Sequence, residues 1–532
     1  MSIKSMSLIG SFRLSKKEWL VFLIILTIGI FARAWNFASM PPGLNVDEAS
    51  IGIEAYDLYK FGIDRNAVSY PVHLISWGSG QNAFYAYLLI PFILINGLNA
   101  FTIRLPMMLA SVLSLPLMYL SGTKLGGKRF GLLAMFFMAI SPWHIVNARW
   151  AVESNILPFL FLAGFTLMLY AAPSNRWFLA SCVFFALSLY AYGTAYLGVP
   201  VFLAFAIPLL LRAKRIALKQ TLLGLAVFAA LALPIALFVL INTFELNEIH
   251  LGALTIPRMP VQARYEAMAA VFGEAPLRAM WNNALIMLKL LWTQEDAFAW
   301  NFVAPFGYFY KMTSAFAALG FLWLILPRKA ESNSATERSL LTLWLCAALA
   351  IGILHPTNLT RLNLIFTPIL FLIAFFIFEL NARIKYALPA ALAALSIAFV
   401  FFLLAYHGAE YRKRAAAAFN EGILPAIEYA REKSPATICF TESTYSLYIY
   451  VLFSEKMNPK EYVQSLEWIS PADPADPART PRSMGRYRFT LSPCAQDPQA
   501  AYILLQKETP PNSNIGYKSK SFGKFQVFVP KR

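Results

Sequence analysis

Long runs of apolar residues constrain this chain more than any other feature of its sequence. Of its 532 residues, 58% are hydrophobic and only 14% are charged, whereas a soluble protein carries about a quarter charged residues. The apolar residues form continuous stretches rather than alternating with polar ones, which argues against a transmembrane β-barrel. The sequence therefore predicts a polytopic α-helical membrane protein.

About 11 of these stretches are predicted to cross the membrane as helices. Their basic flanks place the N-terminus in the cytoplasm, because Lys and Arg accumulate on that side of membrane proteins. An odd number of crossings then puts the C-terminus outside the cytoplasm, and we expect the plasma (inner) membrane as the location. The predicted spans are about 19–36, 101–123, 130–142, 155–171, 177–192, 196–211, 221–241, 309–327, 339–354, 361–380 and 386–406.

Two long loops are predicted on the outer face, at about 37–100 and 242–308. The first contains an apolar segment, 83–98, which is broken by a proline and is short for a span. If this segment crossed the membrane, the basic cluster at 124–129 would lie outside, against the usual charge bias. We therefore interpret 83–98 as an interfacial helix.

The last part of the chain, 407–532, is predicted to form a small extracytoplasmic α/β domain after the transmembrane module 1–406. A helical pattern is expected at 411–433, strands at 437–440, 502–505 and 525–529, and a Pro/Ala/Asp-rich loop at 470–482. Cys439 and Cys494 could form a disulfide if this domain lies outside the cytoplasm.

The charge balance points to membrane lipids as partners. Lys and Arg together number 45 and Asp and Glu number 28, which gives a formal net charge of +17. In a membrane protein such an excess first indicates cytoplasmic anchoring and contact with anionic headgroups. No basic patch interleaved with aromatic residues is present, so nucleic acid is not an expected partner.

An acidic pair, Asp47-Glu48, follows the first apolar stretch on the predicted outer face. Asp47 could take a proton from an acceptor hydroxyl or bind a divalent cation. The alternative is that Asp47 only caps the helix that follows, since Asp is a favoured N-cap. Glu48 is a further candidate, although neighbouring helical residues point about 100° apart and Glu48 could serve only to shape the loop.

The second predicted outer loop, 143–154, offers three more candidates. Glu153 lies at the mouth of a span, where a carboxylate is costly and often functional, unless it is solvated at the interface. Arg149 and His144 could neutralise a phosphate, Arg149 through a bidentate fork. Interfacial anchoring is the alternative for both.

His355 and Arg361 flank a short predicted outer turn. Arg361 runs against the charge bias there, which suggests an anionic partner such as a lipid phosphate, with snorkelling to headgroups as the alternative. In the late loop, Asp296 and Trp300 are polar and aromatic enough to line a substrate site.

Several ordered motifs resemble one family. They are Pro41-Pro42-Gly43-Leu44-Asn45-Val46-Asp47-Glu48-Ala49, Ser76-Trp77-Gly78, Gln81-Asn82-Ala83, Arg104-Leu105-Pro106, Ser141-Pro142-Trp143-His144 and Arg149-Trp150-Ala151-Val152-Glu153-Ser154-Asn155. Together they resemble bacterial membrane glycosyltransferases related to protein O-mannosyltransferases and to the lipid A aminoarabinose transferase, in the GT-C superfamily. The resemblance covers about 1–410 in topology, with the specific motifs in the first 160 residues or so.

The resemblance implies transfer of a sugar from a polyprenyl-phosphate donor to a glycan, lipid or protein hydroxyl on the outer face. Asp47 then matches the first-loop aspartate, as base or as acceptor or metal ligand, and Glu153 matches the acidic residue of the second loop. Trp77, Gln81 and Asn82 would line the substrate site. The aminoarabinose transferases carry an acidic–basic pair where this chain has Trp77-Gly78-Ser79-Gly80-Gln81, which weakens any inference of a metal or a lipid A acceptor.

Two other functions remain open at this point. A transporter or flippase of lipid-linked sugars would be expected to show repeats and charges near the membrane midplane, and the chain has few such charges and no repeat. A non-enzymatic assembly or sensing protein could use the tail to bind glycan. A divalent cation, held by Asp47 and Glu153, is the only cofactor that the sequence suggests.

Overall fold

The computed structural model describes residues 7–263, 265, 270, 275–298, 300–325, 335–434, 436–468, 481–511 and 516–531. The contacts within the chain divide it into two compact units. Unit 1 comprises Met1–Phe37, Met107–Ala236 and Tyr265–Tyr411, and unit 2 comprises Ala38–Pro106, Leu237–Arg264 and Arg412–Arg532.

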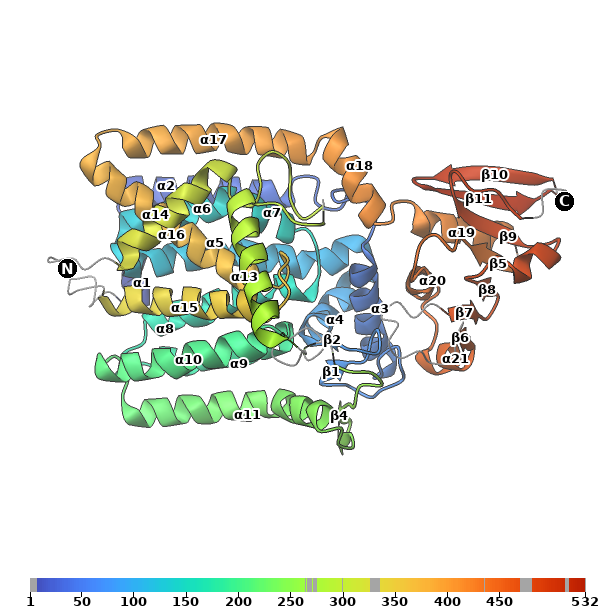
Figure 1. Ribbon diagram of the computed structural model, residues 1–532, viewed down its shortest axis with the longest axis horizontal. Helices are drawn as coiled ribbons and strands as arrows, with labels where there is room; N and C mark the ends of the chain where they lie inside the picture. Colours follow the sequence, from blue (N-terminus) through green and yellow to red (C-terminus); the bar gives the residue numbers. More distant parts are fainter. Residues whose placement is uncertain are drawn as a thin grey trace. The chain divides into compact units, whose positions relative to one another are not determined.

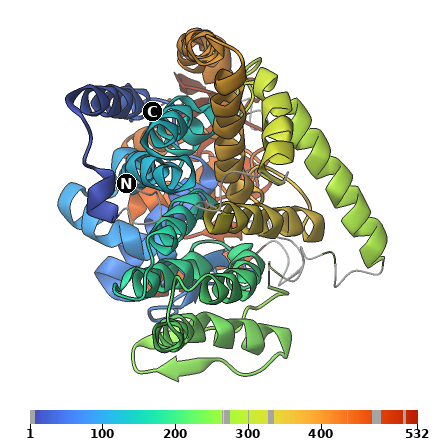
Figure 2. The ribbon, with the colours of Figure 1, turned by 90° about the vertical axis from the view of Figure 1, so that its left-hand side faces the viewer.

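Unit 1 is a bundle of helices. Figures 1 and 2 show that most of its helices run alongside one another. They are α1 (Leu8–Ser11), α2 (Lys16–Ala34), α6 (Lys128–Ile140), α7 (Pro142–Asn147), α8 (Leu157–Leu169), α9 (Trp177–Ala191), α10 (Ala195–Arg212), α13 (Pro276–Thr293), α14 (Ser314–Ile325), α15 (Ala335–Leu354), α16 (Asn363–Arg383) and α17 (Ala387–Tyr406), with most of α5 (Ala100–Gly126) and α11 (Leu218–Thr243).

Each of the predicted spans overlaps a helix. Six described helices are long and apolar enough to cross a membrane, namely α5, α10, α11, α15, α16 and α17. Others are shorter or more charged: α6 has 13 residues, and a helix of that length rises about 20 Å against a hydrocarbon core of roughly 30 Å. A membrane protein with several spans is thus supported, and the count of about 11 stays a prediction.

Burial separates the centre of unit 1 from its periphery. Within the most apolar 18-residue stretch of each helix, 83% of α16 is buried, compared with 22% of α11 and 17% of α17. A helix that is apolar all round and buried belongs to a core, and one that exposes apolar residues needs a lipid environment. Helix α16 is therefore the central helix, and α11 and α17 present apolar faces to the outside.

Unit 2 combines two parts of the predicted outer loops with the tail. The first loop contributes α3 (Val46–Phe61), the short strands β1 (His73–Leu74) and β2 (Gln81–Asn82), and α4 (Phe84–Asn96). The late loop contributes the hairpin of β3 (Ile249–Leu251) and β4 (Leu254–Ile256). The segment predicted as an interfacial helix is indeed helical, and its place at an interface stays a prediction.

The tail forms a mixed seven-stranded sheet of order β10-β11-β9-β5-β8-β7-β6. Strand β5 pairs in parallel with β8 and β9, and the other pairs are antiparallel. The elements are α18 (Ala409–Ala418), α19 (Ile423–Lys433), β5 (Ile438–Phe440), α20 (Tyr448–Glu455), α21 (Pro459–Gln464), β6 (Leu466–Trp468), β7 (Pro481–Met484), β8 (Tyr487–Arg488), β9 (Ala501–Leu505), β10 (Tyr517–Phe522) and β11 (Phe525–Pro530).

The three predicted tail strands are confirmed as β5, β9 and β11, and the helical pattern at 411–433 is split between α18 and α19. Strands β6, β7, β8 and β10 were not predicted. The predicted loop at 470–482 lies outside the described residues up to 480. Cys439 of β5 and Cys494 are joined by a disulfide in a buried cluster with Tyr502 and Leu504.

Candidate functional site

The acidic pair lies in the first turn of α3, and its helix cap is Asn45. Asn45 Oδ1 accepts a hydrogen bond from the Asp47 amide at 3.0 Å, and Glu48 Oε2 accepts one from the Asn45 amide at 3.1 Å. The Asn45 side chain also accepts from the Glu48 amide, so the cap residue and the third helical residue satisfy each other's backbone donors, which is a capping box. The alternative that Asp47 is the N-cap is therefore wrong.

Glu48 forms a buried ion pair with Arg104. Arg104 Nε donates to Glu48 Oε1 and Nη2 donates to Oε2, each at 2.8 Å, and both side chains have no exposed surface. The same guanidinium donates to the carbonyl oxygens of Pro41 and Gly43 at 2.8 and 2.7 Å. The carboxylate of Glu48 thus anchors the loop that precedes α3, while the adjacent Asp47 is half-buried.

Residues from the tail support the same loop. Tyr450 donates its hydroxyl to the Leu44 carbonyl at 2.9 Å and accepts from Asn420 Nδ2 at 2.8 Å. Asn45 Nδ2 donates to the Ala418 carbonyl at 3.2 Å. At Gly43, whose φ is +78°, a Cβ would lie 2.3 Å from the carbonyl oxygen of Phe419, so only glycine allows this close approach.

Arg65 connects α3 to the segment that contains the predicted substrate-lining residues. Its guanidinium donates to Ser50 Oγ at 2.9 Å and to Ser76 Oγ at 3.0 Å, and it lies 4.6 Å from the ring centre of Trp77. The hydroxyls of Ser50 and Ser76 both donate to Gln81 Oε1. Trp77 and Gln81 are thereby held against the helix that carries Asp47.

Asn82 is also buried, on the β1–β2 ladder opposite His73. Of the predicted substrate-lining residues in the first loop, Trp77 is half-buried, while Gln81 and Asn82 are buried. Trp77 therefore offers the most accessible surface of the three.

Three further carboxylates surround Arg65 with little or no exposure. Glu54 forms an ion pair with Arg65 at 3.2 Å, and Asp57 and Asp64 are buried beside them. Burial raises the pKa of Asp57 to about 9, with the charge of Glu54 adding to the shift. Burial also raises the pKa values of Glu54 and Asp64. The protonated forms are favoured because burial penalises the charged carboxylates, and the single guanidinium of Arg65 does not offset this for all three.

Arg149, in unit 1, is fully buried and is used by the backbone. It donates to the carbonyl oxygens of Arg33 at 3.1 Å and of Trp35 and Asn36 at 2.8 Å, at the C-terminal end of α2. Its guanidinium also lies 5.4 Å from the ring centre of Tyr406. Carbonyls at the end of a helix lack intrahelical partners, and Arg149 supplies donors to them. Its contact with a phosphate stays a prediction.

His144 is buried in a network with Arg33. Arg33 Nη2 donates to His144 Nδ1 at 2.6 Å, and Arg33 Nε donates to Ser111 Oγ at 2.7 Å. A guanidinium is only a donor, so Nδ1 must be the acceptor and the neutral ring carries its proton on Nε2. His144 Nδ1 is therefore bound by the cationic Arg33, and a contact of His144 with a phosphate stays a prediction.

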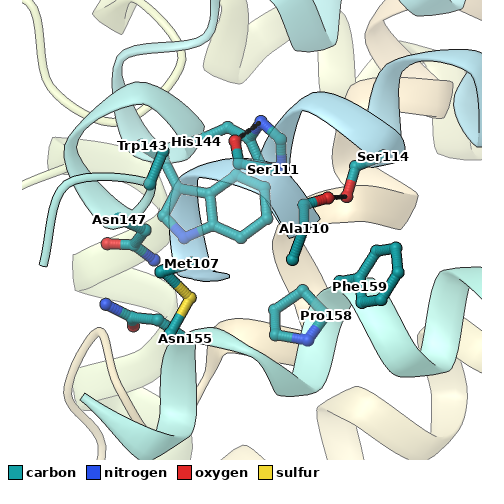
Figure 3. A pocket seen from close by; sticks show the side chains of 11 residues that line it. Met107, Ala110, Ser111, Ser114, Trp143, His144, Asn147, Asn155, Pro158 and Phe159 are labelled. Carbon is teal, nitrogen blue, oxygen red and sulfur yellow. Dashed lines mark hydrogen bonds between the residues drawn. The ribbon is translucent and has the colours of Figure 1, made fainter. Parts of the chain in front are cut away.

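A pocket within unit 1 is lined by His144 and by other residues of α5, α7 and α8 (Figure 3). Trp143 Nε1 donates to Asn363 Oδ1 at 2.9 Å, and because indole only donates, this contact fixes the orientation of the Asn363 amide. Asn147 Nδ2 donates to the same oxygen at 3.0 Å, which leaves the buried Asn147 Oδ1 without a partner.

Glu153 is 3% exposed and begins the 3-10 helix η2 (Glu153–Asn155), next to this pocket in sequence. Asn155, two residues later, lines the pocket and accepts from Asn363 Nδ2 at 2.9 Å. The second predicted outer loop thus brings His144, Arg149 and Glu153 into one buried segment of unit 1.

The remaining candidates meet at another part of unit 1. Asp296 Oδ2 accepts from the Leu359 amide at 2.7 Å and so connects the late loop to the turn between α15 and α16. On this turn, His355 is buried, and Arg361 is half-buried and donates to the Pro356 carbonyl at 2.9 Å. Trp300 is half-buried, and its carbonyl accepts from Tyr411.

No group of three or more His, Cys, Asp or Glu side chains that could hold a metal ion occurs among the residues that the structure describes. A divalent cation held by Asp47 and Glu153 stays a prediction.

Arg104 and Arg65 were not predicted as site residues, although Arg104 belongs to one of the family-like motifs. Arg104 lies near a predicted outer end of a span, where basic residues are less common, and this position was the signal that could have identified it. Asn45, directly before the acidic pair, could have been recognised as the cap because Asn is among the most favoured cap residues.

Comparison with known proteins supports the resemblance. A family model described as dolichyl-phosphate-mannose-protein mannosyltransferase matches residues 82–239. None of the curated protein sequences matches the chain.

Among solved structures, ArnT from Cupriavidus metallidurans bound to undecaprenyl phosphate has a TM-score of 0.59 at 12% identity, and the match covers 97% of this chain and 98% of that one. The apo state of the same protein has a TM-score of 0.53 at 12% identity, covering 96% and 97%. The apo oligosaccharyltransferase from Archaeoglobus fulgidus has a TM-score of 0.51 at 15% identity, covering 84% and 64%. Residues 82–239 thus match a mannosyltransferase family model, and the chain shares the fold of these membrane glycosyltransferase structures.

Proposed function

We propose that this protein transfers a sugar from a polyprenyl-phosphate-linked donor to an acceptor hydroxyl at the outer face of the plasma membrane, with Asp47 as the general base. The bound undecaprenyl phosphate of the ArnT structure and the dolichyl-phosphate donor in the name of the matched family support this donor class. The acceptor hydroxyl could belong to a glycan, a lipid or a protein.

The observation that carries the proposal is the different use of two adjacent carboxylates. Glu48 is fully buried and bound by Arg104, so its charge is neutralised within the protein. Asp47 is half-buried on the same helical turn, which is held by Asn45, Arg104 and Tyr450. A rigidly mounted, partly accessible carboxylate is what a general base requires.

In the proposed reaction, the acceptor oxygen forms a bond to the anomeric carbon of the donor sugar. The bond between that carbon and the phosphate oxygen breaks, and the electron pair leaves with the polyprenyl phosphate. The acceptor proton passes to the Asp47 carboxylate. Inversion at the anomeric carbon follows if the acceptor attacks from the face opposite the phosphate.

A cation stabilises the charge that develops on a leaving phosphate. Unit 1 offers Arg361 for this role, because its side chain is half-buried, whereas the guanidinium of Arg149 donates to backbone carbonyls. The Cys439–Cys494 disulfide supports an extracytoplasmic tail, since disulfides persist in oxidising compartments.

The test compares Asp47→Asn and Glu48→Gln in membranes supplied with a radiolabelled polyprenyl-phosphate sugar and with native acceptor lipids, glycans and proteins. Asp47→Asn should abolish transfer while its thermal stability equals that of the wild type. Undiminished transfer by a well-expressed Asp47→Asn protein would rule out Asp47 as the base. Transfer activity that requires neither carboxylate would refute the proposed site.

A further inference from the structure

Helix α13 carries a continuous apolar stripe that no described residue of unit 1 covers. Along this helix Leu277, Trp281, Leu285, Leu288 and Trp292 recur every three or four residues, so they share one face. Leu277 is 80% exposed, and Trp281 and Trp292 are each 66% exposed. Single exposed apolar residues are ordinary, but a stripe that includes two tryptophans marks a binding surface.

The opposite face of α13 is anchored to the end of α15. Asn283 Nδ2 donates to the Ile353 carbonyl at 3.1 Å, and Thr357 Oγ1 donates to the Asn283 carbonyl at 3.3 Å. A Cβ on Gly352 would lie 2.3 Å from Met287 Sδ, which shows how closely α13 approaches α15. The stripe is therefore held in a fixed orientation, pointing away from the bundle.

The direction of α13 differs from that of the spans. Figures 1 and 2 show α13 crossing the flank of the unit 1 bundle, whereas α15, α16 and α17 run along it. The contacts of α13 are with residues 352–357, where the candidate span α15 ends. A helix that lies across the end of a span lies near the level where hydrocarbon meets headgroups.

We propose that α13 is a membrane-lying helix whose apolar stripe inserts into the lipid surface. Lipid is the occupant that the observations favour, because the exposed apolar faces of α11 and α17 in the same unit require the same environment. The helix carries Arg278 and Lys289, both exposed, and no acidic residue. This charge suits anionic headgroups, and tryptophans are enriched at membrane interfaces.

A membrane-lying α13 changes the expected topology of the late loop. The predicted outer loop at 242–308 would then not be wholly in water, since its central helix is embedded in one leaflet. It also places lipid next to the turn that carries His355 and Arg361, because α13 contacts that turn through Thr357.

The experiment uses site-directed spin labels on the full chain in vesicles of phosphatidylethanolamine and phosphatidylglycerol, with the exposed Cys346 replaced by Ala. Labels at Leu285→Cys and Leu288→Cys test the stripe, Leu222→Cys on α11 is the lipid-facing control, and Ser519→Cys on β10 is the water-facing control. These four positions are exposed, so the labels should not disturb folding.

Both stripe labels should be more accessible to oxygen than to a water-soluble nickel chelate, at a depth of about 5–10 Å below the lipid phosphates. A nickel accessibility equal to that of the Ser519→Cys label would show a water-exposed helix and overturn the proposal. Low accessibility to both reagents would show that protein covers the stripe, such as a second copy of the chain, and would also overturn it. In vesicles with brominated acyl chains, Trp281→Phe/Trp292→Phe should lose part of the tryptophan quenching seen in the wild type, and equal fractional quenching would contradict insertion.

Discussion

The variant Glu48→Gln should have a lower unfolding temperature of unit 2 than the wild type. Among the described residues, Glu48 is the only acidic side chain that forms an ion pair with Arg104, and the substitution removes its charge. Glutamine keeps the length of the side chain and can still complete the capping box. It can accept only one of the two hydrogen bonds that Arg104 Nε and Nη2 now donate at 2.8 Å.

The magnitude follows from the complete burial of both side chains. Breaking a buried ion pair by removing one partner costs about 3–5 kcal/mol, and the retained amide acceptor puts the expected loss near about 3 kcal/mol. For a unit of roughly 200 residues this corresponds to a fall in Tm of about 6–12 °C. Arg104 would also loosen its hold on the Pro41 and Gly43 carbonyls, so the loop before α3 should become mobile.

The assay is thermal unfolding of the purified protein in detergent, followed by size-exclusion fluorescence, with Asp47→Asn as the matched control. Asp47→Asn should unfold at the wild-type temperature. The double variant Glu48→Met/Arg104→Met should recover part of the stability, because removing both charges leaves neither one unpaired. An unchanged Tm for Glu48→Gln combined with lost transfer would refute the reasoning and make Glu48 a chemical participant.

Three further outcomes are expected. Asp57 binds its proton more tightly in the folded protein, where its pKa is about 9 against a usual value of 3.8, so its contribution to stability is lost as pH rises from about 4 to about 9. The fall in Tm between pH 6 and pH 9 should therefore be smaller in Asp57→Asn than in the wild type, and an equal fall would contradict this. Tyr450→Phe leaves the buried Leu44 carbonyl and Asn420 amide without a partner, at a cost of about 1–3 kcal/mol, and should reduce transfer. The control Tyr502→Phe loses a similar bond to the Cys494 carbonyl and should reduce stability alone. Equal transfer activity of the two variants would argue against support of the Asp47 loop by the tail. The Cys439–Cys494 disulfide spans 55 residues, and its removal should lower the stability of unit 2 by about 4 kcal/mol. The double variant Cys439→Ala/Cys494→Ala should therefore have a lower Tm than the control Cys182→Ala, and an unshifted Tm would contradict this.

The helices could be predicted because hydrophobicity is a local property of the sequence. Each predicted span has a helix, and the strands at β5, β9 and β11 follow from short runs of β-forming residues. Helix α13 was missed because Arg278, Asn282, Asn283 and Lys289 interrupt its apolar residues, although their spacing of three and four residues was available as a helical signal.

The roles of charged side chains were harder to predict, since a sequence shows a charge but not the atoms it faces. Arg149 was expected to meet a phosphate, a contact that stays a prediction, and in the folded chain its guanidinium donates to backbone carbonyls at the end of α2. Glu48 and Arg104 are 56 residues apart, and only the folded chain shows that they neutralise each other. The accessibility of Asp47 follows from that pairing, because the buried position on the same turn is taken by its neighbour.

The hydrogen bonds from the tail to the Asp47 loop also have a consequence for biosynthesis. The Tyr450–Leu44 bond joins residues 406 positions apart, and the Asn45–Ala418 bond joins residues 373 positions apart. At about 5–20 residues per second, ribosomes need roughly 20–80 s to make the intervening chain. A nascent protein could thus have all of its spans in the membrane and still lack a formed acidic loop, so that chains truncated before the tail would remain inactive in the bilayer.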